Sequence, residues 1–100
     1  MQVRVFIHRK IIPGKEDQAH ELLRKLRALA QQHPGYQGGE LLSDPDSPQT
    51  MITTAIWQDA DAWADWAKSP GRLEIESQLR TLLQEASRVR IFGREEVAGA

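Results

Sequence analysis

The residues best suited to hold an organic ligand are three tryptophans that lie close together in the sequence. Trp57, Trp63 and Trp66 are the only tryptophans of the chain. Trp63 and Trp66 stand three residues apart, which places them on one face of a helix. Aromatic side chains gathered in this way either seal a small core or form the wall of a site for a flat molecule. Core packing is the commoner role of aromatics at helical spacing, so both interpretations stay open.

His8 is the candidate for acid–base chemistry. It lies beside Phe6 in an alternating segment, and an imidazole exchanges protons near neutral pH, as a general base for a phenolic substrate must. The alternative for His8 is a polar residue at the rim of a dimer. We expect His20 to be solvated and His33 to cap the end of a helix. The spacing of the three histidines is not that of metal ligands, so we predict no metal site.

Four arginines offer a second kind of chemistry. Arg4, Arg88, Arg90 and Arg94 lie on two segments that we expect to pair as strands. They are able to bind an anionic substrate, but charged strand edges that discourage aggregation explain them equally well.

The chain divides into segments with strand patterns and segments with helix patterns. Period-two alternation or β-forming residues predict strands over residues 2–11, 36–43, 49–58 and 88–97. A leucine-rich stripe predicts a helix from Lys15 to the His33-Pro34-Gly35 stop. Two further helices are predicted over residues 59–68 and 70–86, with Asp59 and Ser69 as N-caps and Pro70 at a first helical position.

This element order predicts the fold and the assembly. A βαββαβ order with right-handed crossovers gives a ferredoxin-like plait, an α+β fold with a four-stranded antiparallel sheet and helices on one face. We expect the other face to carry Phe6, Phe92 and part of Met51 and Trp57. A partly apolar, uncovered face in so small a domain predicts a homodimer through the open sheet face, closed into a barrel.

Composition narrows the possible partners. The 100 residues suit a single domain, 1–100, with a core of about 2–97. The 13 basic and 14 acidic residues nearly cancel, so we expect no binding to nucleic acid or to a membrane. The absence of cysteine excludes disulfides, thiolate metal sites and a cysteine nucleophile. The first ten residues alternate apolar and charged side chains and form no apolar signal core, so we expect a cytoplasmic protein.

The chain resembles the antibiotic biosynthesis monooxygenase domain family of dimeric α+β barrel proteins. The resemblance is carried by VRVFIHRKIIPGKE, HPGYQGGELL and ITTAIWQDADAWADWAKSP, and it spans roughly residues 2–97. It implies one of two activities. Some members are cofactor-independent oxygenases that convert phenolic or anthrone-like compounds to quinones with molecular oxygen, whereas others bind and degrade haem.

The family's functional positions map only partly onto this sequence. The tryptophan that both groups share falls on Trp66. The asparagine and histidine of the haem-degrading members fall near Ile7 and Glu76, so the resemblance argues against that type of haem degradation. The asparagine and tyrosine of the quinone-forming members map to Ala62 and Arg72.

The leading hypothesis is therefore a small dimeric enzyme that resembles the cofactorless monooxygenases and acts on an aromatic, quinol-type compound. It needs no cofactor, because the substrate itself donates an electron to oxygen, and His8 is the candidate base. Its pocket is expected between the helices and the sheet, with Trp63, Trp66, Phe6, Phe92 and Arg72 binding the substrate. The competing hypothesis is a non-catalytic dimeric ligand-binding or structural domain, and haem binding ranks third.

Overall fold

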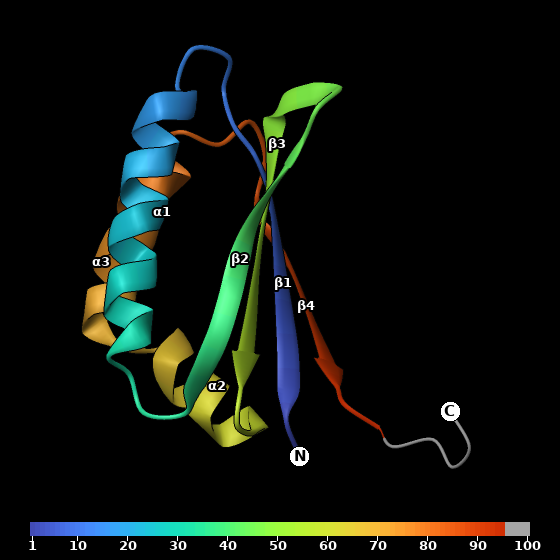
Figure 1. Cartoon of the computed structure of the whole chain (residues 1–100). Helices are drawn as coiled ribbons and strands as arrows, with labels where there is room; N and C mark the ends of the chain where they lie inside the picture. Colours follow the sequence, from blue (N-terminus) through green and yellow to red (C-terminus); the bar gives the residue numbers. More distant parts are fainter. Residues whose placement is uncertain (96–100) are drawn as a thin grey trace.

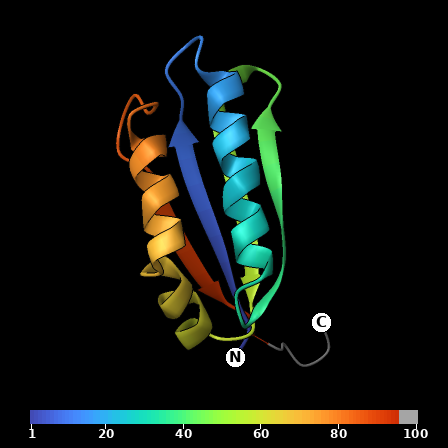
Figure 2. The ribbon, with the colours of Figure 1, turned by 90° about the vertical axis from the view of Figure 1, so that its left-hand side faces the viewer.

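The computed structural model describes residues 1–95 of the chain and contains one sheet and three helices in that range. The elements are β1 (Val3–Lys10), α1 (Glu16–Gln31), β2 (Tyr36–Asp44), β3 (Ser47–Trp57), α2 (Ala60–Ala67), α3 (Pro70–Arg80) and β4 (Arg88–Gly93). The strands are antiparallel in the order β2-β3-β1-β4. All three helices lie on one side of the sheet (Figure 1), and α1 and α3 run side by side across it (Figure 2). The predicted α+β ferredoxin-like βαββαβ fold is confirmed.

Alternation along β1 separates the two faces of the sheet. Val3, Val5 and Ile7 are buried beneath the helices, whereas Phe6 and His8 point to the opposite side, called here the open face. This division was predicted from the period of two. Residues that are paired across neighbouring strands point to the same face of the sheet. The pairing of β1 with β3 and β4 therefore assigns the residues of those strands to the helix-covered face or to the open face.

Two residues do not lie where the sequence analysis expected them. Met51 and Trp57 pair with Arg9 and Val3 of β1 and are 1% and 0% exposed. They therefore belong to the helix-covered core, and the prediction that part of them lies on the open face is wrong. The reason is register, because the segment 49–58 has apolar residues on both faces and its sequence alone does not say which set meets the helices.

The helix ends follow most of their predicted signals. The Asp59 carboxylate accepts a hydrogen bond from the backbone N–H of Ala62 at 2.8 Å, which confirms the N-cap of α2. Pro70 begins α3 as predicted. Ser69 occupies the N-cap position of α3 as predicted, but its hydroxyl donates to the Trp66 carbonyl oxygen at 2.9 Å and makes no capping hydrogen bond. The hydroxyl is engaged there because α2 ends immediately before, and carbonyl groups of its last turn accept hydrogen bonds from the residues that follow.

Two predicted elements are shorter in the structure. Helix α3 ends at Arg80, whereas the sequence pattern extended the helix to residue 86. Strand β4 ends at Gly93, and of the predicted remainder to residue 97 the last two residues lie outside the described range. Among residues 1–95 no helix is both long enough and apolar enough to cross a membrane.

The core is a single apolar cluster between the helices and the sheet. Its buried members are Val3, Val5, Ile7, Ile11, Ala19, Leu23, Leu26, Ala30, Met51, Trp57, Trp66, Ile75, Leu79 and Leu82. One charged residue, Arg9, is buried with them at 0% exposure.

Candidate functional site

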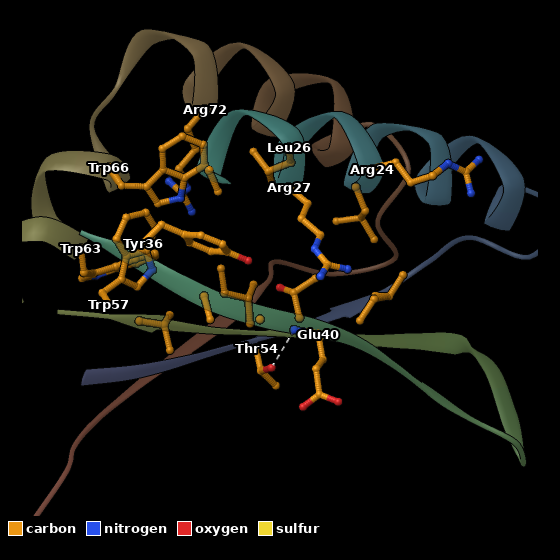
Figure 3. Close-up of a pocket in the computed structure, with 18 residues that line it drawn as sticks. Arg24, Leu26, Arg27, Tyr36, Glu40, Thr54, Trp57, Trp63, Trp66 and Arg72 are labelled. Atoms are coloured by element: carbon orange, nitrogen blue, oxygen red, sulfur yellow. Dashed lines mark hydrogen bonds between the residues drawn. The ribbon is translucent and has the colours of Figure 1, made fainter. Parts of the chain in front are cut away.

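A cavity of about 140 Å³ lies between helix α1, the α2–α3 pair and the helix-covered face of the sheet (Figure 3). Most of its lining is aliphatic or aromatic, from β1, α1, β2, β3 and the α2–α3 pair. The lining residues are Val5, Ile7, Leu23, Arg24, Leu26, Arg27, Ala30, Tyr36, Gly39, Glu40, Leu41, Thr53, Thr54, Ala55, Trp57, Trp63, Trp66 and Arg72. An apolar cleft with a few polar groups is the usual form of a small-molecule site.

Trp57 forms the centre of an aromatic wall at one end of the cavity. The Trp66 ring stacks on it with a centroid distance of 5.9 Å, and the Trp63 ring lies 6.3 Å away. The Tyr36 ring meets Trp57 edge to face at 5.3 Å. Such contacts hold the rings rigidly against one another. The Trp57 indole Nε1 is buried without a hydrogen-bond partner among the described residues, so it is an unused donor in this wall.

His33 supports this wall from the α1–β2 connection. Its ring lies 5.8 Å from Trp57 and 5.4 Å from Trp66. Its Nε2 is 2.9 Å from a carboxylate oxygen of Asp65 on α2. The prediction that the imidazole caps α1 is wrong, because the carboxylate on α2 is a stronger partner than the last carbonyls of the helix.

Polar groups from β2 and α1 project into the middle of the cavity. Figure 3 shows the Tyr36 hydroxyl and the Arg27 guanidinium directed into it, whereas the Glu40 carboxylate points away to the open face. Gly39 makes room for the tyrosine. A Cβ at this position would stand 3.0 Å from the Tyr36 hydroxyl and 2.2 Å from the Thr54 carbonyl oxygen.

A buried charge cluster lies at the junction of β1 and α3. Arg9 pairs with the Glu76 carboxylate and donates to Thr53 Oγ1 at 3.1 Å. Burial lowers the pKa of Arg9, although Glu76 opposes this effect. Arg72 also belongs to the cluster, since its Nη2 lies 3.7 Å from Glu76. Its Nη1 donates to the Ala67 carbonyl oxygen at 2.9 Å, and its guanidinium lies 5.4 Å from the Trp63 ring centroid.

The structure brings together only half of the predicted site. Trp63, Trp66 and Arg72 all line the cavity. Phe6 and Phe92 lie on the open face, where their rings meet edge to face at 5.7 Å. The prediction of one pocket walled by all four aromatic residues is therefore wrong, because even-numbered residues of β1 point away from the helices.

His8 and the strand arginines also lie away from the cavity. The His8 Nδ1 is 3.4 Å from Arg88 Nη2 on the open face. Arg4 and Arg90 belong to the same face, where Arg90 lies 5.3 Å from the Phe92 ring centroid. A sheet thus separates His8 from any ligand in the cavity of the same chain. A functional role of His8 and of the strand arginines stays a prediction.

Sequence reasoning missed Arg9, Arg27 and Tyr36. Arg9 was detectable, because it continues the odd-numbered series of buried residues in β1. Tyr36 and Arg27 carry no such signal, since their place depends on the pairing of Tyr36 with Trp57 and on the packing of α1 over β2. Among residues 1–95 no group of three or more metal-ligating side chains comes together.

Comparisons with known proteins agree with this architecture. A family model described as antibiotic biosynthesis monooxygenase matches residues 2–78. None of the curated proteins matches the chain in sequence. A conserved protein from Methanosarcina mazei Go1 superposes with a TM-score of 0.90 at 17% identity, covering 95% of this chain and 94% of that one. SnoaB, a cofactor-independent oxygenase from Streptomyces nogalater, gives 0.83 at 22% identity and covers 100% of both chains.

Rv0793 from Mycobacterium tuberculosis superposes with a TM-score of 0.88 at 17% identity, covering 99% of this chain and 100% of that one. At such identities these likenesses establish the fold alone. The family match extends over more than three quarters of the sequence, from β1 into α3. The chain belongs to the antibiotic biosynthesis monooxygenase family.

Proposed function

We propose that the protein is a small homodimeric, cofactor-independent monooxygenase that oxidises an aromatic, quinol-type compound with molecular oxygen. The observation that carries the proposal is the cavity walled by Trp57, Trp63, Trp66 and Tyr36. It is lined by aromatic rings and by few polar groups, as a site for a flat, oxidisable ring must be. Membership of the family and the fold shared with SnoaB, described as a cofactor-independent oxygenase, support it.

The proposed reaction needs no redox group on the protein. For an anthrone-type substrate, the ring methylene loses two hydrogens and gains one oxygen atom as a carbonyl, while the second oxygen atom leaves as water. The deprotonated substrate is itself the reductant, because it passes an electron to oxygen. The contribution of the protein is to bind the ring, exclude bulk water and favour the deprotonated form.

The predicted residues take different places in this proposal. Trp63 and Trp66 contact the rings of the substrate, and Arg72 lies beside its oxygen substituents. His8 is assigned to its alternative role at the dimer rim, since it lies across the sheet from the cavity. Phe6 and Phe92 pack in the interior of the proposed dimer.

Oxygen uptake with a panel of hydroquinones and anthrones tests the activity. We expect uptake of one molecule of oxygen per substrate and loss of most turnover in Trp63→Leu, because Trp63 is only partly buried and its loss leaves the core intact. Leu73→Ala is the control, since this exposed side chain on α3 lies outside the cavity lining. Binding without oxygen uptake across the panel would instead favour the non-catalytic ligand-binding domain.

Light scattering tests the homodimer. The open face exposes Phe92 at 47% and Leu42 at 43%, and apolar surface of this kind favours association of two copies. We expect twice the chain mass of 11.3 kDa at micromolar concentration, and the chain mass alone for Phe92→Glu, which would bury a charge at the interface. A monomeric wild-type protein would refute the assembly.

A further inference from the structure

The cluster beside the cavity contains more positive than negative charge. Arg9 and Arg72 share one carboxylate, that of Glu76, whose oxygen Oε1 contacts both. Arg9 is 0% exposed and the side chains of Arg72 and Glu76 are 12% and 14% exposed. Arg72 is one of the causes that lower the pKa of Arg9, as expected for two cations held close together. Buried charge is costly unless it is fully paired, and one positive charge of this cluster is not.

The remaining charged residues of the cavity do not supply the missing anion. Arg24 is already paired with Glu21 at 2.9 Å near the surface. Arg27 forms no ion pair within residues 1–95, and its guanidinium points into the cavity. Glu40 is the only acid among the lining residues, and its carboxylate lies on the other side of the sheet (Figure 3). The cavity lining is therefore cationic as well as aromatic, and among its arginines only Arg72 is largely buried.

We infer that the cavity takes an aromatic ligand bearing a negatively charged oxygen, a carboxylate or a phenolate, and that Arg72 recognises this charge. The inference rests on the proposed function, because it names the substrate class of the same site.

Arg72 is suited to this task by its position and its unused donor. It lies at the tryptophan end of the cavity, with its guanidinium over the Trp63 ring. Its Nε is buried and has no acceptor among the described residues. A guanidinium beside an aromatic wall binds an anionic oxygen while the rings of the ligand pack on the tryptophans.

Arg9 acts as a positioning residue in the same arrangement. It holds Glu76 through its own ion pair and is fixed in turn by Thr53. Glu76 accepts a hydrogen bond from Arg9 and also lies 3.7 Å from Arg72. One carboxylate thus faces two guanidinium groups, so the cluster keeps one excess positive charge that a ligand beside Arg72 is able to balance.

Two probes of matched shape test the inference. 2-Naphthoate and 2-naphthamide differ in charge but hardly in size, and isothermal titration calorimetry gives the Kd of each. We expect naphthoate to bind at least tenfold more tightly, with a preference that weakens as salt is added. In Arg72→Gln the preference should fall below threefold while the Kd of naphthamide stays within threefold. Arg72→Lys should retain part of it, and Arg80→Gln on the same helix, outside the cavity, should retain all of it.

A third probe, 2-naphthol, distinguishes the two anions. Its absorbance reports the naphtholate, and a bound phenolate lowers the midpoint pH of its titration. A naphthoate preference alone supports a carboxylate ligand, and a lowered naphthol midpoint alone supports a phenolate.

Equal binding of naphthoate and naphthamide with an unchanged midpoint overturns the inference and leaves the proposed oxygenase standing. A preference that survives in Arg72→Gln overturns the assignment to Arg72. Absence of binding by all three probes overturns the inference and the ligand site together, whereas charge-selective binding without oxygen uptake by any quinol refutes only the oxygenase.

Discussion

Replacing Glu76 by leucine should destabilise the fold more than any ordinary surface change. Arg9 has 0% exposure, and without the carboxylate it keeps only Thr53 as a side-chain partner among the described residues. Removing one partner of a buried ion pair costs about 3–5 kcal/mol, because the other charge stays buried and uncompensated. A domain of this size loses about 4–8 °C in Tm per kcal/mol, so the melting temperature should fall by roughly 12 °C or more.

The double variant Arg9→Met/Glu76→Leu separates a buried charge from lost packing. It removes both partners and fills their space with apolar groups, which is often nearly neutral for stability. We expect it to be more stable than Glu76→Leu by about 2 kcal/mol or more. Urea unfolding followed by tryptophan fluorescence, at one fixed protein concentration, gives both free energies. The reasoning fails if Glu76→Leu costs less than about 1 kcal/mol, or if the double variant merely adds the costs of the single ones.

Two further predictions concern backbone space and pH. Gly39→Ala should lower the free energy of unfolding in urea by about 1–3 kcal/mol, since its Cβ would stand 2.2 Å from the Thr54 carbonyl oxygen. Gly71→Ala should be neutral or slightly stabilising, because the nearest neighbour of its Cβ is a flexible leucine methyl at 3.2 Å. Equal losses of stability in the two variants would contradict this prediction. The backbone N–H groups of Glu16 itself and of Gly14 hold the pKa of the Glu16 carboxyl below its usual range. The stabilising effect of this carboxylate is therefore present above the unfolded-state pKa and lost as pH falls through the folded-state pKa. The difference in unfolding free energy between wild type and Glu16→Gln should shrink from about pH 6 to pH 3. A difference that stays constant over this range would refute the linkage.

The sequence was sufficient for the fold because its signals are local and repeated. The alternation in β1 separated Val5 from Phe6 without any structure, and Asp59 marked the start of α2 by its chemistry alone. Such signals depend on a strand period or on a single cap, and both act within a few residues of the chain.

The site was harder to predict because it depends on contacts between distant segments. Trp57 belongs to the core only through its pairing with Val3 and Tyr36, and a shift of one residue would turn it to the open face. The position of Arg27 over the cavity likewise follows from the packing of α1. The predicted pocket mixed the two faces, because its aromatic residues were chosen by type and not by register.

Strand β1 carries two proposed functions on its two faces. Its odd-numbered side chains contribute Val5 and Ile7 to the cavity lining and Arg9 to the charge cluster. Its even-numbered side chains place Phe6 and His8 on the open face, where the dimer is proposed to form. Because the sheet separates the two sets of contacts, a change on one face has no shared partner on the other, and its effects should add. Loss of anion binding and loss of dimerisation are therefore separable by mutating residues that are neighbours in sequence.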